Sequence, residues 1–220
     1  MGKSIFCIVG ETGSGKSFYN NSIVLDKKFM KAARLEPLIY GTTREPRATE
    51  VDGLDYNFVT QEEYDSIDQN DLIESRSYYT MNGKKYYFTR RDYITNKKKN
   101  LICTSSLYQY ESYRNWVANE NIKRPGSYNL YLIILYANVK ERLTRIINRR
   151  CDTDDQVYEA CRRIVEEKAE FDQVKARIPE LTDYLSYNTV LYINTNDITQ
   201  ENNLINLNKI KQFIVSKTSK

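Results

Sequence analysis

Residues 5–17 read Ile-Phe-Cys-Ile-Val-Gly-Glu-Thr-Gly-Ser-Gly-Lys-Ser, a short apolar run followed by a segment that fits G-x-x-x-x-G-K-[ST]. The apolar run is typical of a buried parallel strand. The glycines allow a tight turn whose N–H groups point inward at an anion, and the helix expected to follow adds the positive end of its dipole. The sequence therefore predicts a phosphate-binding loop, although a glycine-rich turn without a ligand remains the alternative. The predicted loop comprises Gly10, Glu11, Thr12, Gly13, Ser14, Gly15, Lys16 and Ser17.

Two side chains of the loop have the chemistry that phosphate transfer requires. Lys16 has the length to reach the β- and γ-phosphates of a nucleotide, and the Ser17 hydroxyl can ligate Mg²⁺. Taken alone, the loop therefore predicts only that a phosphate group is bound and is hydrolysed or transferred.

Outward from the loop, apolar and amphipathic segments alternate along the chain. Such alternation predicts an α/β fold, with a parallel sheet flanked by helices and the loop at the carboxyl edge of that sheet. Residues 40–90 are more polar and predict a small mixed α/β insertion. The expected strands are 5–9, 37–40, 56–59, 72–75, 85–88, 101–103, 128–136 and 189–193; the expected helices are 15–33, 61–70, 108–120, 139–150, 154–177 and 204–215.

Composition narrows the classes of function. The chain has 220 residues, a formal net charge of +4 and no histidine, which excludes Ser-His and Cys-His hydrolases and most catalytic zinc sites. The mild positive charge suits an anionic ligand and does not predict nucleic acid binding. No signal-peptide pattern or apolar run long enough for a membrane is evident, so we expect a cytoplasmic protein with reduced cysteines and no membrane partner.

A second phosphate site is predicted about thirty residues after the loop. Residues 42–47 read Thr-Thr-Arg-Glu-Pro-Arg, and residues 50–59 read Glu-Val-Asp-Gly-Leu-Asp-Tyr-Asn-Phe-Val. Arg44 and Arg47 suit a terminal phosphate because the planar guanidinium binds phosphate through two hydrogen bonds. Two phosphate sites together indicate direct phosphoryl transfer, whose catalysis is largely positioning and charge neutralisation.

These motifs resemble the guanylate kinases, a family of nucleoside monophosphate kinases with a phosphate-binding loop. The match is good over residues 4–90 and looser over 130–195. The resemblance implies a core (1–38, 96–140 and 167–220), a monophosphate-binding insertion (39–95) and a helical lid (141–166). It also implies ATP and Mg²⁺, with a nucleoside monophosphate, GMP or dGMP, as the acceptor, and a monomer or homodimer.

The resemblance also assigns roles to individual residues. For the acceptor phosphate it implies Thr43, Arg44, Arg47, Tyr56 and Tyr87. For the base it implies Glu74, with Thr89 and Ser106 at positions where the family contacts the base. In the lid it implies Arg149 and Arg163 as the catalytic arginines beside Lys16, with Arg145 and Arg150 as competitors. Near the adenine of ATP it implies Asn194.

The chain departs from the family pattern at several positions. Tyr40-Gly41 stands where the family has Ser-Ser, so a bulky phenol replaces a small hydroxyl near the phosphate. Phe88 stands in place of a glycine and is expected to reshape the wall of the base pocket. Thr104-Ser105-Ser106 replaces Asp-x-Asp, which removes carboxylates that support Mg²⁺ and contact the base.

Three hypotheses follow. The leading one is ATP-dependent phosphoryl transfer to a nucleoside monophosphate, most simply GMP or dGMP. The second is a catalytically impaired, guanylate-kinase-like module that binds proteins; the retained Lys16 and Ser17 argue against it. The third is a kinase for another nucleotide or a sugar phosphate; Glu74 and the complete Arg44/Arg47 motif favour a nucleotide over a sugar phosphate.

Overall fold

The fold is built on a five-stranded parallel sheet, seen in a computed structural model that describes residues 2–80, 83–150, 153–175, 178 and 189–218. The strand order is β2-β7-β1-β8-β9, with β1 in the centre and Cys7 aligned with Cys103 on one side and Leu132 on the other. The predicted parallel sheet is therefore confirmed, and its central strand leads directly into the predicted loop. The strands are β1 (Lys3–Val9), β2 (Leu35–Pro37), β7 (Asn100–Ser105), β8 (Tyr128–Tyr136) and β9 (Val190–Asn194).

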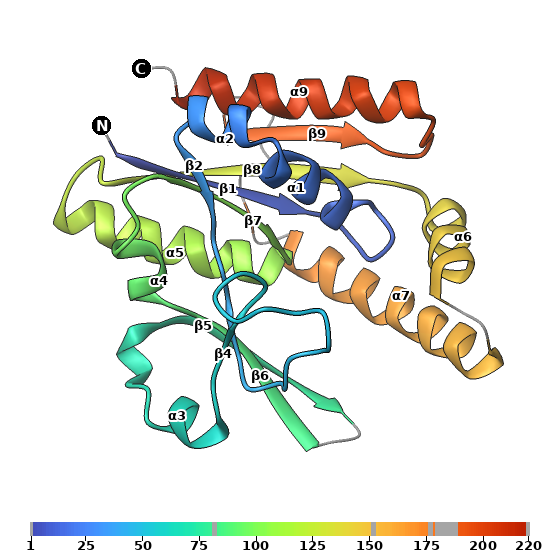
Figure 1. Ribbon diagram of the computed structural model, residues 1–220, viewed down its shortest axis with the longest axis horizontal. Helices are drawn as coiled ribbons and strands as arrows, with labels where there is room; N and C mark the ends of the chain where they lie inside the picture. Colours follow the sequence, from blue (N-terminus) through green and yellow to red (C-terminus); the bar gives the residue numbers. More distant parts are fainter. Residues whose placement is uncertain (1, 81–82, 151–152, 176–177, 179–188, 219–220) are drawn as a thin grey trace.

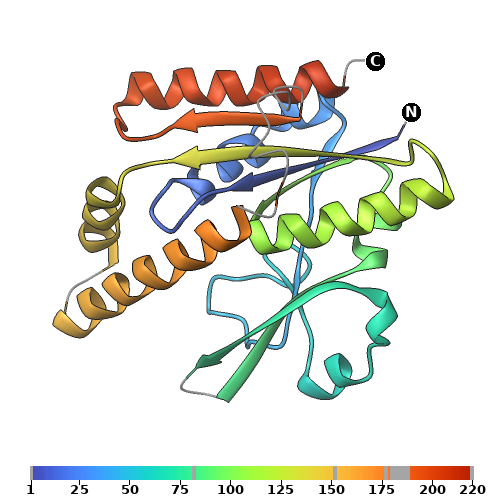
Figure 2. The ribbon, with the colours of Figure 1, turned by 180° about the vertical axis from the view of Figure 1, so that it is seen from behind.

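Helices cover both faces of this sheet (Figures 1 and 2). Side chains alternate along a strand, so β1 sends Ile5 and Cys7 to one core and Phe6 and Ile8 to the other. The first core is closed by α5 (Leu107–Lys123) and α7 (Asp154–Lys175). The second is closed by α1 (Lys16–Leu25), α2 (Lys27–Ala32) and α9 (Gln200–Thr218). The central strand is thus fixed from both faces, which gives the loop at its end a rigid base.

The helix predicted over residues 15–33 is in fact two helices, α1 and α2. Asp26 ends the first, and its carboxylate accepts a hydrogen bond from the backbone N–H of Phe29 at 3.0 Å, which makes it the N-cap of the second. Short acidic side chains favour caps over helix interiors, and that preference overrides the continuous apolar pattern.

A second, four-stranded sheet with the order β4-β3-β6-β5 forms the insertion. Its long strands pair antiparallel, as predicted for a hairpin, with Glu74 opposite Thr89 and Arg76 opposite Tyr87. Thr60 and Glu63 form a capping box at the start of α3, and this helix is shorter than the predicted 61–70. The elements are β3 (Gly41–Thr42), β4 (Asn57–Phe58), α3 (Gln61–Asp65), a 3-10 helix η1 (Gln69–Asp71), β5 (Leu72–Thr80), β6 (Gly83–Arg90) and α4 (Arg91–Thr95).

Phe88, which stands where the family has a glycine, packs inside the insertion. Its ring is completely buried and packs against Tyr64 and Tyr93, on the face of β6 opposite to Thr89. Gly41 lies opposite Phe88 on the neighbouring strand, and a Cβ atom there would come within 2.3 Å of the ring. The absent side chain at Gly41 therefore provides the space that Phe88 fills.

The helix α6 (Val139–Arg150) and the first part of α7 carry the segment that the sequence assigns to a lid (Figure 1). None of the described helices is long and apolar enough to cross a membrane. Cys7 and Cys103 are buried thiols within strands, as expected, and Cys161 is exposed on α7.

Candidate functional site

The loop after β1 has a backbone shape that depends on glycine. Gly13 and Gly15 have φ values of +83° and +98°, in the left-handed region that favours glycine. A Cβ atom on Gly13 would lie 2.7 Å from the carbonyl oxygen of Arg142, so the loop also packs closely against α6. Gly15 is the N-cap of α1, whose first turn carries Lys16 and Ser17. The predicted strand, loop and helix are all present.

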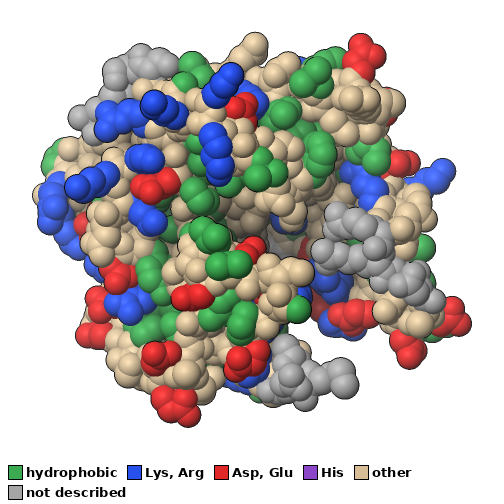
Figure 3. Space-filling view, viewed as in Figure 1, with side chains coloured by type: hydrophobic (Ala, Val, Ile, Leu, Met, Phe, Trp, Pro, Cys, Tyr) green, Lys and Arg blue, Asp and Glu red, His purple; other side chains and the backbone are tan. Residues whose placement is uncertain are grey.

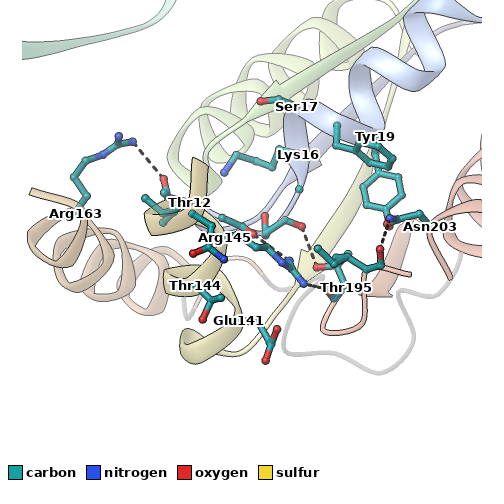
Figure 4. Close-up of a pocket in the computed structure, with 17 residues that line it drawn as sticks. Thr12, Lys16, Ser17, Tyr19, Glu141, Thr144, Arg145, Arg163, Thr195 and Asn203 are labelled. Atoms are coloured by element: carbon teal, nitrogen blue, oxygen red, sulfur yellow. Dashed lines mark hydrogen bonds between the residues drawn. The ribbon is translucent and has the colours of Figure 1, made fainter. Parts of the chain in front are cut away.

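Lys16 lies beside a cavity of about 690 Å³ formed by the loop, α6, α7 and the segment after β9 (Figure 4). Its ammonium group donates a hydrogen bond to the carbonyl oxygen of Gly10, across the loop. Burial lowers the pKa of Lys16, and the nearby carboxylate of Glu167 opposes that shift. A cation held in a partly dehydrated cavity attracts an anion more strongly than a cation in open water does.

Two arginines of α6 hold the loop from outside. Arg142 is 1% exposed, forms an ion pair with Glu11 at 2.9 Å and donates to the carbonyl oxygen of Thr12 at 3.3 Å. Arg145 donates to the carbonyl oxygens of Gly13 at 3.1 Å and of Asn196 at 3.0 Å. The sequence analysis missed Arg142, although its spacing of three from Arg145 places both on one helix face. Both arginines therefore brace the backbone of the loop.

From α7, Glu167 and Arg163 reach the same loop. The Glu167 carboxylate accepts hydrogen bonds from both the backbone N–H and the hydroxyl of Thr12. Arg163 borders the cavity, with its guanidinium 3.3 Å from the Thr12 hydroxyl and 3.4 Å from Glu167 (Figure 4). The structure thus brings Arg163 to the loop as expected. The side chains of Arg149 and Arg150 lie outside the described part of the chain.

The segment after β9 forms another wall of the cavity. Thr195 borders it, and its hydroxyl donates to the carbonyl oxygen of Ser14 at 2.9 Å. The predicted Asn194 does not line the described cavity; its side-chain oxygen instead accepts from the N–H of Asn196 at 2.9 Å. Thr195, the residue after the predicted Asn194, is the one that borders the cavity.

In the insertion, Arg44 is the centre of a group that we call the Arg44 cluster, with Glu50, Tyr56 and Tyr87. The guanidinium makes two contacts of 2.9 Å with the Glu50 carboxylate, and its Nε donates to the Tyr87 hydroxyl at 3.1 Å. It also lies over the Tyr56 ring, 5.4 Å from its centroid. Hydrogen bonds from Arg44 hold the pKa of Glu50 below its usual value. Glu50 thus orients Arg44 and occupies the fork that could bind a phosphate.

The two other predicted phosphate contacts of this region differ in exposure. Arg47 has a side chain that is 74% exposed, and its guanidinium lies 3.6 Å from Glu50. Thr43 is buried, and its hydroxyl accepts a hydrogen bond from the backbone N–H of Tyr86 at 2.9 Å. Arg47 is therefore open to a ligand, whereas Thr43 holds the strand pair together.

The predicted base-contacting residues do come together, in a group that we call the Glu74 cluster: Glu74, Thr89, Ser106 and Gln109. One oxygen of Glu74 accepts from the Thr89 hydroxyl at 2.7 Å and from the Gln109 amide at 3.2 Å. The other oxygen is buried and has no hydrogen-bond partner among the described residues. Burial raises the pKa of Glu74, and only 5% of the residue is exposed. An unpartnered buried carboxylate oxygen is costly, and a ligand N–H would satisfy it.

Ser106 is the N-cap of α5, and its hydroxyl accepts from the Arg76 guanidinium at 3.1 Å and from the Gln109 N–H at 3.2 Å. Sequence reasoning missed Gln109 and Arg76. The S-x-x-Q spacing of a capping box at 106–109 is the signal that indicates Gln109.

The donor set for a metal ion is sparse. The described residues contain no group of three acidic, histidine or cysteine side chains that could hold an ion. The Ser17 side chain lies at the first turn of α1 and borders the cavity (Figure 4). Tyr40, where the family has a small hydroxyl, donates to the carbonyl oxygen of Thr104 at 2.7 Å and so braces the end of β7. The Ser17 hydroxyl is thus the side chain of the loop that could contribute a ligand to Mg²⁺.

Between the core and the insertion the surface is hollowed, and Lys and Arg side chains border the hollow (Figure 3). The loop follows β1 of the core sheet, whereas Arg44 and Glu74 belong to the insertion.

Comparison with known proteins gives a consistent result. Residues 2–175 match the family described as guanylate kinase. The chain is 29% identical to a guanylate kinase of Bartonella henselae over 152 residues, which are 69% of this chain and 62% of that protein. It is 29% identical to a guanylate kinase of Mesoplasma florum over 185 residues, or 82% of this chain and 53% of that protein. The matched region is thus less than two thirds of the length of each of these relatives.

Among solved structures, the fold resembles that of a guanylate kinase from Anaplasma phagocytophilum. The TM-score is 0.53 at 16% sequence identity, and the match covers 99% of this chain and 87% of that chain. At this identity the likeness concerns the fold alone.

Proposed function

The chain belongs to the guanylate kinase family, and we propose that it transfers a phosphoryl group from ATP to a nucleoside monophosphate, GMP or dGMP, giving the diphosphate and ADP. The observation that carries this proposal is the pairing of an intact phosphate loop with the Arg44 and Glu74 clusters in the insertion. The first supplies a donor site and the others supply sites for the phosphate and the base of an acceptor. A protein that only bound other proteins would not need this pairing.

For the donor, we propose that residues Gly10–Ser17 enclose the phosphates of ATP, with Lys16 against the transferred group. Arg163 and Arg149 would neutralise charge on that group, and Thr195 and Asn194 would lie toward the adenine. Mg²⁺ would bind at Ser17 and, when bound, would offset negative charge on the phosphate oxygens. The intact Lys16 and Ser17 beside a cavity support this assignment.

For the acceptor, we propose that Arg44 and Arg47 bind the monophosphate, together with Thr43, Tyr56 and Tyr87. Glu50 already fixes the orientation of Arg44, so binding requires only that the phosphate replace the Glu50 carboxylate at the guanidinium. The base would lie against Glu74, Thr89 and Ser106, where the unpartnered oxygen of Glu74 accepts a ring N–H. No side chain needs to form a covalent intermediate, since positioning and charge neutralisation suffice.

We also propose that the domain boundaries separate the donor site from the acceptor site. The core comprises 1–38, 96–140 and 167–220, the acceptor is held by 39–95, and 141–166 form a lid. The two separate sheets and the contacts of α6 and α7 with the loop support this proposal.

The test is ADP release from ATP with each of the eight ribo- and deoxynucleoside monophosphates. We expect turnover with GMP and dGMP above the other six, and we expect ATP to bind in calorimetry. An absence of turnover with every monophosphate would contradict the proposal. Weak or absent ATP binding would instead favour a module that binds proteins.

A further inference from the structure

The residue Arg76 stands between the two clusters of the acceptor site. On the β5–β6 hairpin, Arg76 lies opposite Tyr87 and Glu74 lies opposite Thr89. Residues directly opposite in an antiparallel pair share a face of the sheet, and so do residues two apart on one strand. Tyr87 contacts Arg44, and Thr89 contacts Glu74. A ligand that spans from Arg44 to Glu74 must therefore pass Arg76.

The guanidinium of Arg76 is held in place by its surroundings. It donates to the Ser106 hydroxyl at 3.1 Å, and it lies over the rings of Tyr108, at 5.0 Å, and Tyr78, at 5.6 Å. It is close enough to Glu74 to favour the charged carboxylate, although burial still raises the pKa of Glu74. A planar guanidinium with a fixed fork of donors suits the edge of a planar base.

The cluster pairs a donor with an acceptor. The free oxygen of Glu74 accepts an N–H, and Arg76 donates to an oxygen or a ring nitrogen. A 6-oxopurine has a ring N–H and a carbonyl oxygen on adjacent atoms of one edge. At the same two positions adenine has an unprotonated ring nitrogen and an amino group. In the same pose, the lone pair of that nitrogen would face the carboxylate, and the amino N–H would face the guanidinium, so neither hydrogen bond could form.

We propose that Arg76 is a specificity-determining residue of the acceptor site, and that it donates to the carbonyl oxygen of a 6-oxopurine whose ring N–H binds Glu74. The inference rests on the proposed function, because it takes the monophosphate to lie between Arg44 and Glu74. It goes beyond that function by assigning a base-reading role to a residue outside the motifs in the sequence.

The experiment is calorimetric binding of GMP, IMP and AMP to the full chain and to Arg76→Ala. IMP keeps the ring N–H and the carbonyl but lacks the 2-amino group of GMP. Because hydrogen bonds to a charged group contribute about 1.5–3 kcal/mol, we expect Kd to rise about 10- to 100-fold for both GMP and IMP. For AMP we expect a change below about threefold on the same basis.

Two variants separate base reading from a structural role. Lys84→Ala removes one positive charge from the same hairpin, where Lys84 lies over the Tyr86 ring, and should leave all three Kd values unchanged. Arg76→Gln keeps N–H donors without the charge and should give an intermediate loss of affinity for GMP and IMP. This variant serves as the test if Arg76→Ala folds poorly. A loss shared equally by all three nucleotides, a loss confined to GMP, or no loss would each overturn the inference.

Turnover is measured separately from binding. A chain that shows the expected binding pattern but releases no ADP would refute the proposed function and leave the role of Arg76 in base recognition standing. An active chain in which Arg76→Ala shows no base-dependent loss would refute the inference alone.

Discussion

The phosphate loop and the Arg44 cluster are both predicted to bind phosphate, yet the residues that hold them in place lie at different distances along the chain. The loop is held by Arg142, Glu167 and Thr195, whose bonds to it span 130, 155 and 181 residues. Arg44 is oriented by Glu50, six residues away, and by Tyr87 on a nearby strand of the same sheet. The loop therefore depends on packing of the whole core, whereas the Arg44 cluster is held by contacts within the insertion.

This difference has a consequence for how the two sites respond to mutation. A change in a distant support of the loop should alter both stability and donor binding, because the same contacts join α6, α7 and the loop. A change in the Arg44 cluster should remain confined to the acceptor.

The largest effect is expected at Lys16. Loss of one group that stabilises developing charge typically lowers kcat by about 10²- to 10³-fold, and we expect at least that for ADP release by Lys16→Ala. Lys28→Ala, which removes an exposed lysine from α2, is the matched control and should leave turnover unchanged. Retention of normal turnover by Lys16→Ala would remove the loop from the mechanism.

A smaller and more selective effect is expected at Arg44. Arg44→Ala should raise KM for the monophosphate about 10- to 100-fold, the equivalent of one or two charge-assisted hydrogen bonds, and leave KM for ATP within about twofold. Steady-state kinetics with each substrate varied in turn measures both constants. Arg124→Ala, at the exposed end of α5, is the control. A matching rise in KM for ATP would show that the acceptor cluster is coupled to the loop and would break the comparison.

The same contrast explains which parts of the site could be predicted from sequence. The loop is predictable because Gly13 and Gly15 encode its left-handed backbone locally. Arg44 and Glu50 belong to one local motif, whereas the contact of Arg44 with Tyr87 depends on strand pairing. Glu167 and Arg142 were not found as supports, since no local pattern shows which helix face will pack on a loop more than a hundred residues away. The pairing of Gly41 with Phe88 required the register of the strands, which sequence spacing left open.

The overall fold was predictable for a related reason. Buried parallel strands appear as apolar runs, so the order of strands and helices along the chain follows from local pattern. The end of α1 at Asp26 did not follow, because the same pattern continues into α2 and only the capping bond separates them.

An intermediate effect is expected at two adjacent glutamates of α7, which test whether contacts from a distant helix stabilise the loop. Glu167 binds the loop at Thr12, whereas Glu166 pairs with Arg162 on the exposed surface. We expect Glu167→Gln to lower the free energy of unfolding in urea by about 1–2 kcal/mol, because an amide replaces one acceptor of a charge-assisted bond. Glu166→Gln should change it by less than about 0.5 kcal/mol. Equal effects of the two variants would mean that the loop gains no stability from α7.

The smallest effect concerns the pH dependence contributed by Glu74. Its pKa is raised by burial above the ordinary value of 4.5, so between 4.5 and the folded-state pKa the native chain binds more protons than the unfolded chain. Stability linked to this group is therefore highest below pH 4.5 and is lost as pH rises through the folded-state pKa. The free energy of unfolding of wild type, minus that of Glu74→Gln, should therefore be smaller at pH 7 than at pH 4. Glu62→Gln, on the exposed side of α3, provides the reference for removal of a surface carboxylate. Added GMP should reduce this loss of wild-type stability at pH 7, because a ring N–H would then partner the buried oxygen. A difference between the two proteins that did not change with pH would mean that Glu74 is not under electrostatic strain without a ligand.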